Sequence, residues 1–231
     1  MANIHNEMRK DIAQLILCYK FAIEEMTTKI NILQEEFRLV HEYSPIEHVG
    51  SRLKSPKSIL KKIEKKKIEL TTKAIEQNIH DIAGIRIVCA FEEDIYRVAE
   101  MLCKQNDVTL VATKDYIKNP KGNGYRSLHL IIKIPIFLST GKREVFVELQ
   151  IRTIAMDFWA SLEHKIYYKY NKVVPQHIKN GLADAANQAN ALDAKMASLN
   201  REINILKKQD ADEEDSMENY IRDFIGIRMQ Q

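Results

Sequence analysis

The 231-residue chain has few cysteines, few glycines and no long apolar run. Its three cysteines, Cys18, Cys89 and Cys103, are widely spaced and form no C-x-x-C pair, which excludes a disulfide framework and a cysteine zinc site. The longest apolar run near the N-terminus, residues 15–19, is far too short to cross a bilayer. These absences predict a protein of a reducing compartment, cytoplasmic, with no membrane partner.

Several common catalytic motifs are also missing. The sequence has no Walker loop, no G-x-G-x-x-G after a strand, no H-E-x-x-H and no G-x-S-x-G. It therefore does not encode P-loop or Rossmann nucleotide sites, zinc-protease sites or acyl-transfer chemistry in their usual forms. The 35 lysines and arginines nearly balance the 32 aspartates and glutamates, and a net charge of +3 does not by itself require a polyanionic partner.

The positive charge is instead concentrated in one segment, residues 50–73, with nine basic and two acidic side chains. Ser55 and Pro56 are typical of a helix N-terminus, with Ser55 as the cap and Pro56 in the first helical position. Three lysines lie close to this helix start: Lys54, Lys57 and Lys61. Because the helix dipole also attracts anions there, the segment predicts a phosphate site.

Hydrophobic periodicity predicts a sheet between two long helices. Apolar residues recur every three or four positions over 16–40 and 182–206, which is typical of heptad helices. Strand-like runs, the last two joined by a hairpin, occupy residues 82–91, 108–116, 127–138 and 144–152. Further helices are expected at 93–106, 154–170 and, after an acidic linker near 210–218, at 217–227. The predicted fold class is α/β (α+β), a mixed β-sheet flanked by helices.

Two of these strand-like runs have a polar stripe along one side. In the run 144–152, alternation separates four aliphatic residues from Phe146, Glu148, Gln150 and Arg152. The run 127–138 has a similar stripe, made of Ser127, His129 and Lys133. Neighbouring polar stripes predict the floor of a cleft, and a solvated sheet face is the alternative.

A pair of carboxylates predicts a metal site. Asp81 begins the first strand-like run, and Glu148 lies on the fourth. Two such oxygen ligands on adjacent strands are the usual protein share of a magnesium site that phosphates and water complete. Alone, Asp81 is more typical of a turn. A flat strand would point Asp81 and Arg86 to opposite faces, so a bulge at Gly84 would be needed to re-aim one of them.

A glycine-rich loop precedes the third strand-like run. It contains Gly122 and Gly124, with Lys121, Tyr125 and Arg126 around them. Glycines let backbone N–H groups approach phosphates, lysine adds charge, and tyrosine offers a face on which a base can stack. A simple hairpin turn is the alternative reading of the same residues.

Four motifs follow one another in a defined order: RLKSPKSI at 52–59, HDIAGIR at 80–86, GNGYRSLH at 122–129 and ELQIRT at 148–153. Together they resemble the synthetase domain of RelA/SpoT-type alarmone synthetases, over about residues 45–170. Without the hydrolase and regulatory domains of the long members, the chain resembles the stand-alone small alarmone synthetases of the RelP/RelQ kind.

The resemblance implies an activity, a cofactor and an assembly. The activity is transfer of the β,γ-pyrophosphate of ATP to the 3′-hydroxyl of GDP or GTP, giving ppGpp or pppGpp and AMP in the stringent response. The implied fold is a nucleotidyltransferase-like mixed sheet, the cofactor is Mg²⁺, and the assembly is a homo-oligomer, a tetramer. The apolar seams at 16–40 and 182–206 predict that it is built through one or both long helices, and the alternative is that the two seams pack on each other within one chain. The domains would be a helical segment 1–44, a synthetase domain 45–172 and a helical segment 173–231.

The resemblance also implies roles for residues on the ATP side. Arg52 and Arg86 would sandwich the adenine, because planar guanidinium groups stack on a base. The ATP phosphates would be held by Lys54, Lys57 and Lys61. Asp81 and Glu148 would bind Mg²⁺, and Glu148 would also accept the proton of the 3′-hydroxyl.

On the side of the guanine nucleotide, the resemblance implies that Tyr125 stacks on the base. The same pocket would be lined by Lys121, Arg126, His129 and Gln150. Asp157 stands where some relatives have asparagine, and it would contact the guanine edge.

A nucleic-acid-binding module is the alternative function. It would use the basic segment 50–73 as a phosphate track and Tyr125 as a stacking platform. This reading explains the lysines but gives no role to Asp81 and Glu148, which would repel a phosphate backbone. RNA binding is accordingly not predicted.

Overall fold

The computed structural model describes the backbone of residues 2–40, 43–168 and 174–228 and the side chains of 10–40, 43–166 and 174–209. The chain divides into two compact units, Met1–Ala189 and Asn190–Gln231. In the described part, no helix is both long enough and apolar enough to cross a bilayer.

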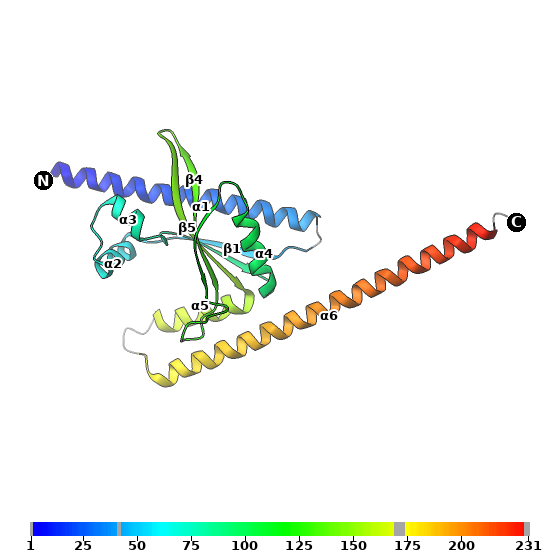
Figure 1. Ribbon diagram of the computed structural model, residues 1–231. Coiled ribbons are helices and arrows are strands. Elements are labelled where there is room, and N and C mark those ends of the chain that lie inside the picture. The colour runs from blue at the N-terminus through cyan, green and yellow to red at the C-terminus, as the bar shows by residue number, and fades with distance from the viewer. Residues whose placement is uncertain (1, 41–42, 169–173, 229–231) are drawn as a thin grey trace. The chain divides into compact units, whose positions relative to one another are not determined.

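The first unit is built on a five-stranded mixed sheet with the strand order β1-β2-β5-β4-β3 (Figure 1). The strands are β1 (Ile46–Leu53), β2 (Ala83–Cys89), β3 (Thr109–Asp115), β4 (Leu128–Leu138) and β5 (Gly141–Thr153). β2 and β5 are parallel and the other neighbours antiparallel. The prediction of a mixed sheet flanked by helices is confirmed, and the predicted hairpin joins β4 to β5.

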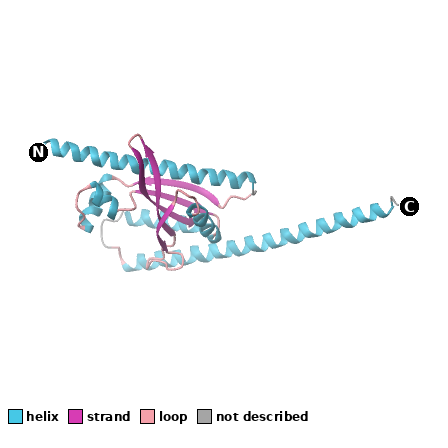
Figure 2. Ribbon diagram, turned by 45° about the horizontal axis from the view of Figure 1, so that its top comes forward, coloured by secondary structure: helices cyan, strands magenta, loops and turns pink. Residues whose placement is uncertain are grey.

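Six helices complete the described chain, around and beyond the strands (Figure 2). They are α1 (Ala2–Val40), α2 (Pro56–Lys66), α3 (Thr72–Asn78), α4 (Glu92–Cys103), α5 (Ile154–Tyr168) and α6 (Gln176–Arg228). α1 and α4 share one hydrophobic core with the aliphatic side chains of β2, β4 and β5. That face of the sheet is therefore closed, which leaves the opposite, polar face for the site.

The apolar seam of α1 packs on the sheet of its own chain. Tyr19, Met26 and Ile30 are almost completely buried in the core that the strands form. The two expectations for this seam, packing against the C-terminal helix or against another subunit, are therefore wrong. The narrow stripe suffices because α4 covers the rest of the same sheet face.

Two elements were not predicted, namely β1 and α3. β1 is the edge strand beside β2, and most of its side chains are exposed or half-buried, so it lacks the aliphatic run that predicts a strand.

The predicted start of α2 is confirmed, because the Ser55 hydroxyl accepts a hydrogen bond from the Ser58 N–H at 3.3 Å.

The acidic segment 210–218 is not a linker. α6 continues through it to Arg228, and the separate helix expected at 217–227 is the end of α6. The segment contains no proline or glycine, and its alanine, methionine and glutamates favour helix. Charge alone therefore misled the prediction.

Candidate active site

The polar face of the sheet forms the floor of a cleft, as predicted. Across the sheet, Arg86 of β2 and His129 of β4 both lie beside Gln150 of β5. A cavity of about 800 Å³ opens over this row. Its lining includes Arg52, Arg86, Lys121, Tyr125, His129, Gln150 and Arg152. Residues predicted for the two nucleotides thus face one space.

Asp81 reaches the site from the segment before β2. It precedes the strand, which begins at Ala83, and the pairing of β2 with β5 runs unbroken through Gly84. The bulge expected at Gly84 is therefore wrong. No bulge is needed, because a residue outside the strand does not follow its alternation.

Two lysines hold Asp81 in place. The Nζ atoms of Lys54 and Lys62 each lie 2.7 Å from its Oδ2. Burial alone would raise the pKa of Asp81, but the hydrogen bonds and charges of the two lysines outweigh it, so its pKa lies below the usual value. Asp81 is therefore ionised at neutral pH.

Lys62 was missed by the sequence analysis, which chose Lys57 and Lys61. In α2 the buried side chains are Ile59 and Ile63, so Lys62 flanks the face turned toward the protein. Lys57 and Lys61 are exposed, and no contact to Asp81 is found for either. Lys62 lies three residues after Ile59 and one before Ile63, and this position beside the buried face is the sequence signal that could have identified it.

Glu148 is held by a histidine and an amide. Its Oε1 lies 3.3 Å from Nδ1 of His129, and its Oε2 accepts a hydrogen bond from Nε2 of Gln150 at 2.9 Å. Burial and the charge of Asp81 raise the pKa of Glu148, whereas the hydrogen bonds from His129 and Gln150 lower it. The lowering effects are the stronger, so the pKa of Glu148 lies below its usual value. Both carboxylates are therefore ionised although they lie close enough to repel each other.

The chemistry of this pair fits a divalent cation. Oδ1 of Asp81 is buried and has no hydrogen-bond partner among the described residues, a state that a bound cation would relieve. Carboxylate oxygens are the ligands that Mg²⁺ prefers. In the described part of the chain no group of three or more histidine, cysteine or acidic residues could hold a metal ion, so the other ligands would be phosphate oxygens and water.

The glycine-rich loop is shaped by α6. Gly124 has φ +87°, and a Cβ there would lie 2.5 Å from the Cβ of Ala186. Both the backbone conformation and the close approach therefore require glycine. On the other side, the Asn123 amide donates to Oε1 of Glu163 on α5 at 3.1 Å. The loop connects the antiparallel neighbours β3 and β4, as the hairpin alternative expects, and it is also packed between two helices.

The aromatic side chains of this region are in contact. The Lys121 ammonium lies 4.5 Å from the ring centre of Tyr116 and 4.6 Å from that of Tyr125. The two tyrosines and His129 meet edge to face. Tyr116 was not singled out from the sequence, because it ends a strand rather than lying in the glycine-rich loop.

Two arginines share Asp157 of α5. Its Oδ1 lies 3.1 Å from Nη1 of Arg152 and 3.3 Å from Nη1 of Arg86. Arg126 lies outside this group and donates to the carbonyl oxygen of Ile117 at 2.9 Å. The predicted contact of Asp157 with guanine stays a prediction, since this carboxylate serves the two arginines here.

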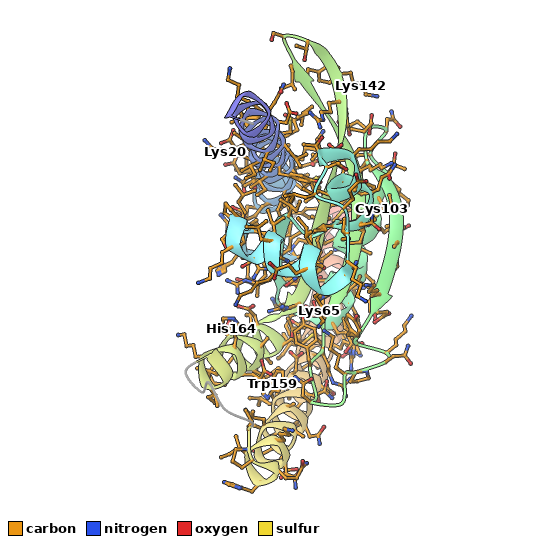
Figure 3. The ribbon with its side chains drawn as sticks, turned by 90° about the vertical axis from the view of Figure 1, so that its left-hand side faces the viewer. Lys20, Lys65, Cys103, Lys142, Trp159 and His164 are labelled. Atoms are coloured by element: carbon orange, nitrogen blue, oxygen red, sulfur yellow. The ribbon has the colours of Figure 1, made fainter. Side chains whose placement is uncertain are left out.

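α5 lines one side of the cleft, and the first turns of α6 pack on α5. Trp159 of α5 is buried, and its Nε1 donates to the carbonyl oxygen of Leu182 at 2.9 Å. Figure 3 shows Trp159 and His164 on α5, whereas Lys142 lies at the far end of the β4–β5 hairpin. Tyr125 packs against the same small cluster, so these helices support the glycine-rich loop.

Comparison with known proteins agrees with the motifs. Residues 51–173, more than half of the chain, match the family described as the region found in RelA / SpoT proteins. The chain belongs to the RelA/SpoT family. The predicted resemblance is therefore confirmed, and the matched range contains every predicted site residue, from Arg52 to Asp157.

The most informative relatives come from Bacillus subtilis. The GTP pyrophosphokinase YwaC is 51% identical over 188 residues, which cover 81% of this chain and 90% of the relative. The structure of small alarmone synthetase 2 superposes with a TM-score of 0.77 at 47% identity, covering 83% of this chain and 99% of that one. The structure of small alarmone synthetase 1 bound to its product pppGpp superposes with a TM-score of 0.78 at 39% identity. The match covers 84% of this chain and 98% of that one. The prediction that this family member is a small alarmone synthetase, a GTP pyrophosphokinase, is confirmed.

Proposed function

We propose that this synthetase transfers the β,γ-pyrophosphate of ATP to the 3′-hydroxyl of GDP or GTP, with Mg²⁺ bound at Asp81 and Glu148. The observation that carries the proposal is a cleft of about 800 Å³ whose lining includes residues predicted for both nucleotides. Arg52 and Arg86 come from the predicted ATP side, and Lys121, Tyr125, His129 and Gln150 come from the predicted guanine side. Reaction between two nucleotides requires that both be held in one space with the reacting atoms in contact. The structures of small alarmone synthetase 1 with pppGpp and with AMPCPP support nucleotide substrates.

On the ATP side, Arg52 and Arg86 are the adenine-stacking pair. Lys54 and Lys62 hold Asp81 now, and their ammonium groups are the nearest cations for the polyphosphate. Lys57 and Lys61 are exposed on α2 and meet the outer part of the polyphosphate. Mg²⁺, when bound, neutralises phosphate charge and withdraws electrons from the phosphorus under attack.

On the acceptor side, Tyr125 stacks on guanine, with Lys121, Arg126, His129, Gln150 and Asp157 around the nucleotide. Glu148 accepts the proton of the 3′-hydroxyl as that oxygen attacks the β-phosphorus and AMP leaves. Since its pKa is lowered, Glu148 is ionised and ready to accept a hydrogen bond from the hydroxyl, but it is a weak base. Orientation and phosphate neutralisation therefore supply most of the rate.

The test is incubation with ATP, GDP and MgCl₂, followed by anion-exchange separation of the nucleotides. We expect AMP and ppGpp in equal amounts, and pppGpp when GTP replaces GDP. Excess EDTA should abolish both products, and added MgCl₂ should restore them. AMP without a guanosine product, or unchanged synthesis in EDTA, would contradict the proposal in its acceptor or its metal.

We also propose self-association into a tetramer, through surfaces other than the α1 seam. On α6 the heptad side chains Leu192, Met196, Leu199, Ile203 and Leu206 are exposed, and on α5 so are Ile154, Phe158, Leu162 and Ile166. Regular apolar stripes of this length are typical of helix interfaces, and a second copy of the chain is the expected partner. Light scattering at micromolar concentration should give about four chain masses of 26.8 kDa, and one chain mass would contradict the proposal. A cytoplasmic location stays a prediction.

A further inference from the structure

Arg152 is a buried cation of the polar sheet face that the sequence analysis assigned to no nucleotide. Only 7% of its surface is exposed. Its Nη2 donates to the hydroxyl oxygen of Tyr125 at 2.7 Å and to Oε1 of Gln150 at 2.8 Å. Its Nη1 donates to Asp157, and its Nε donates weakly to Ser127 Oγ at 3.4 Å. Asp157 supplies the counter-charge that makes the burial tolerable.

One chain of hydrogen bonds runs from Arg152 through an aromatic pair. The Tyr125 hydroxyl lies 2.8 Å from Nε2 of His129, and Nδ1 of His129 lies 3.3 Å from Oε1 of Glu148. A guanidinium has donors only, so the Tyr125 oxygen accepts from Arg152, and its own hydrogen is left to donate to Nε2 of His129. A neutral imidazole that accepts at Nε2 carries its hydrogen on Nδ1 and donates it to Glu148.

A second chain runs from the same nitrogen through an amide. Because Oε1 of Gln150 accepts from Arg152, its NH₂ group is turned the other way. That group donates to Oε2 of Glu148 at 2.9 Å. Two chains with a common origin therefore end on the two oxygens of one carboxylate.

We propose that Arg152 is a positioning residue that sets the direction of both hydrogen-bond chains, so that each oxygen of Glu148 accepts a hydrogen. This inference rests on the role proposed for Glu148 and adds how that side chain is oriented. A neutral side chain at 152 would leave Tyr125 and Gln150 free to reverse.

The direct test is the tautomer of His129 in the free protein, without nucleotide or Mg²⁺. Imidazole ¹⁵N shifts of histidine-labelled protein at pH 8, assigned by comparison with His129→Gln, distinguish hydrogen on Nδ1, on Nε2 or on both. We expect the Nδ1–H form in the wild-type protein. The Nε2–H form, or a doubly protonated ring, would overturn the proposal, because neither is set by Arg152.

Variants then test whether Arg152 sets the direction of the two hydrogen-bond chains. Arg152→Met should convert His129 to a mixture or to the Nε2–H form, whereas Arg152→Lys, also a donor only, should keep Nδ1–H as the major form. Unchanged shifts in folded Arg152→Met would overturn the proposal. If that variant does not fold, Tyr125→Phe decides, because it removes only the hydroxyl link. It should produce the same conversion, and unchanged shifts would again overturn the proposal.

The matched control is Arg143→Met, which removes another arginine of β5 and its ion pair with Glu76. It should leave the His129 shifts as in the wild type, although it costs a similar ion pair. Failure of the synthetase reaction itself would leave the tautomer result standing, so the two proposals are separable.

Discussion

The two carboxylates of the cleft are kept ionised in different ways. Asp81 is paired with the ammonium groups of Lys54 and Lys62, whereas Glu148 accepts hydrogen bonds from His129 and Gln150. Ammonium groups are also attracted by phosphates, so the partners of Asp81 can be shared with an incoming polyphosphate. The Gln150 amide, one of the two partners of Glu148, has no charge and is not attracted to phosphate in this way. Asp81 can therefore exchange its lysine partners for other groups when a polyphosphate binds, whereas Glu148 keeps its partners and its position.

Replacing each carboxylate by its amide should have the largest effect. Glu148→Gln and Asp81→Asn should each lower kcat by about 10² or more while the fold is retained, because both lie on a polar surface. Raising MgCl₂ should restore part of the activity of Asp81→Asn but not of Glu148→Gln, which also loses the proton acceptor. Glu144→Gln, an exposed change on the same strand, is the control. Near-normal turnover in either amide variant would remove the mechanism.

Removal of one lysine should sharpen the comparison further. Lys62→Met should raise the KM for ATP by roughly tenfold or more, because a hydrogen bond to a charged group contributes about 1.5–3 kcal/mol. Lys65→Met, on the same helix and exposed, should leave the KM unchanged. Initial rates over a range of ATP at saturating GDP measure the difference. Equal effects of the two changes would mean that only the overall charge of α2 matters.

The two stacking groups should separate the two substrates. Arg52→Ala should raise the KM for ATP with less effect on the guanine nucleotide, and Tyr125→Ala should do the reverse. The expected size is about 1–3 kcal/mol for each stacked base. If both variants weaken the same nucleotide, the division of the cleft is wrong.

The smallest effect concerns stability in acid. Both pKa values are lowered in the folded protein, so each carboxylate stabilises the fold above its ordinary pKa, and this contribution is lost as pH falls through the lower folded value. Below about pH 4, the free energy of unfolding of Asp81→Asn and Glu148→Gln should therefore depend less on pH than that of the wild type. Urea titrations from pH 6 to pH 3 measure this. Added salt should weaken the contribution of Asp81 more than that of Glu148.

The long helices show what spacing predicts and what it does not. Tyr19, Met26 and Ile30 in α1 follow the same three-four rule as Leu192 and Met196 in α6. The first set is buried against the sheet, and the second is exposed. Spacing predicts that a helix has an apolar face, but what covers that face depends on contacts distant in sequence.

The site shows a similar division. Alternation along β5 correctly placed Glu148, Gln150 and Arg152 on one face, because strand geometry is local. The bond from Lys62 to Asp81 depends on how α2 is turned toward β2, and a polar edge strand such as β1 has no local signal at all. Resemblance implied which residues hold the nucleotides, a prediction that stays to be tested, but it said nothing of the bonds that connect Arg152 to Glu148.

The close packing of Gly124 against Ala186 bears on where the chain can be shortened. A cut at the predicted boundary 172/173 would remove Leu182 and Ala186, which cover Trp159 and support the glycine-rich loop. The compact unit instead extends to Ala189. An autonomous catalytic fragment should therefore retain the first four turns of α6, and a chimera with another helix should keep alanine at 186. The loop proposed to bind the guanine nucleotide thus depends on a helix that carries none of the four sequence motifs.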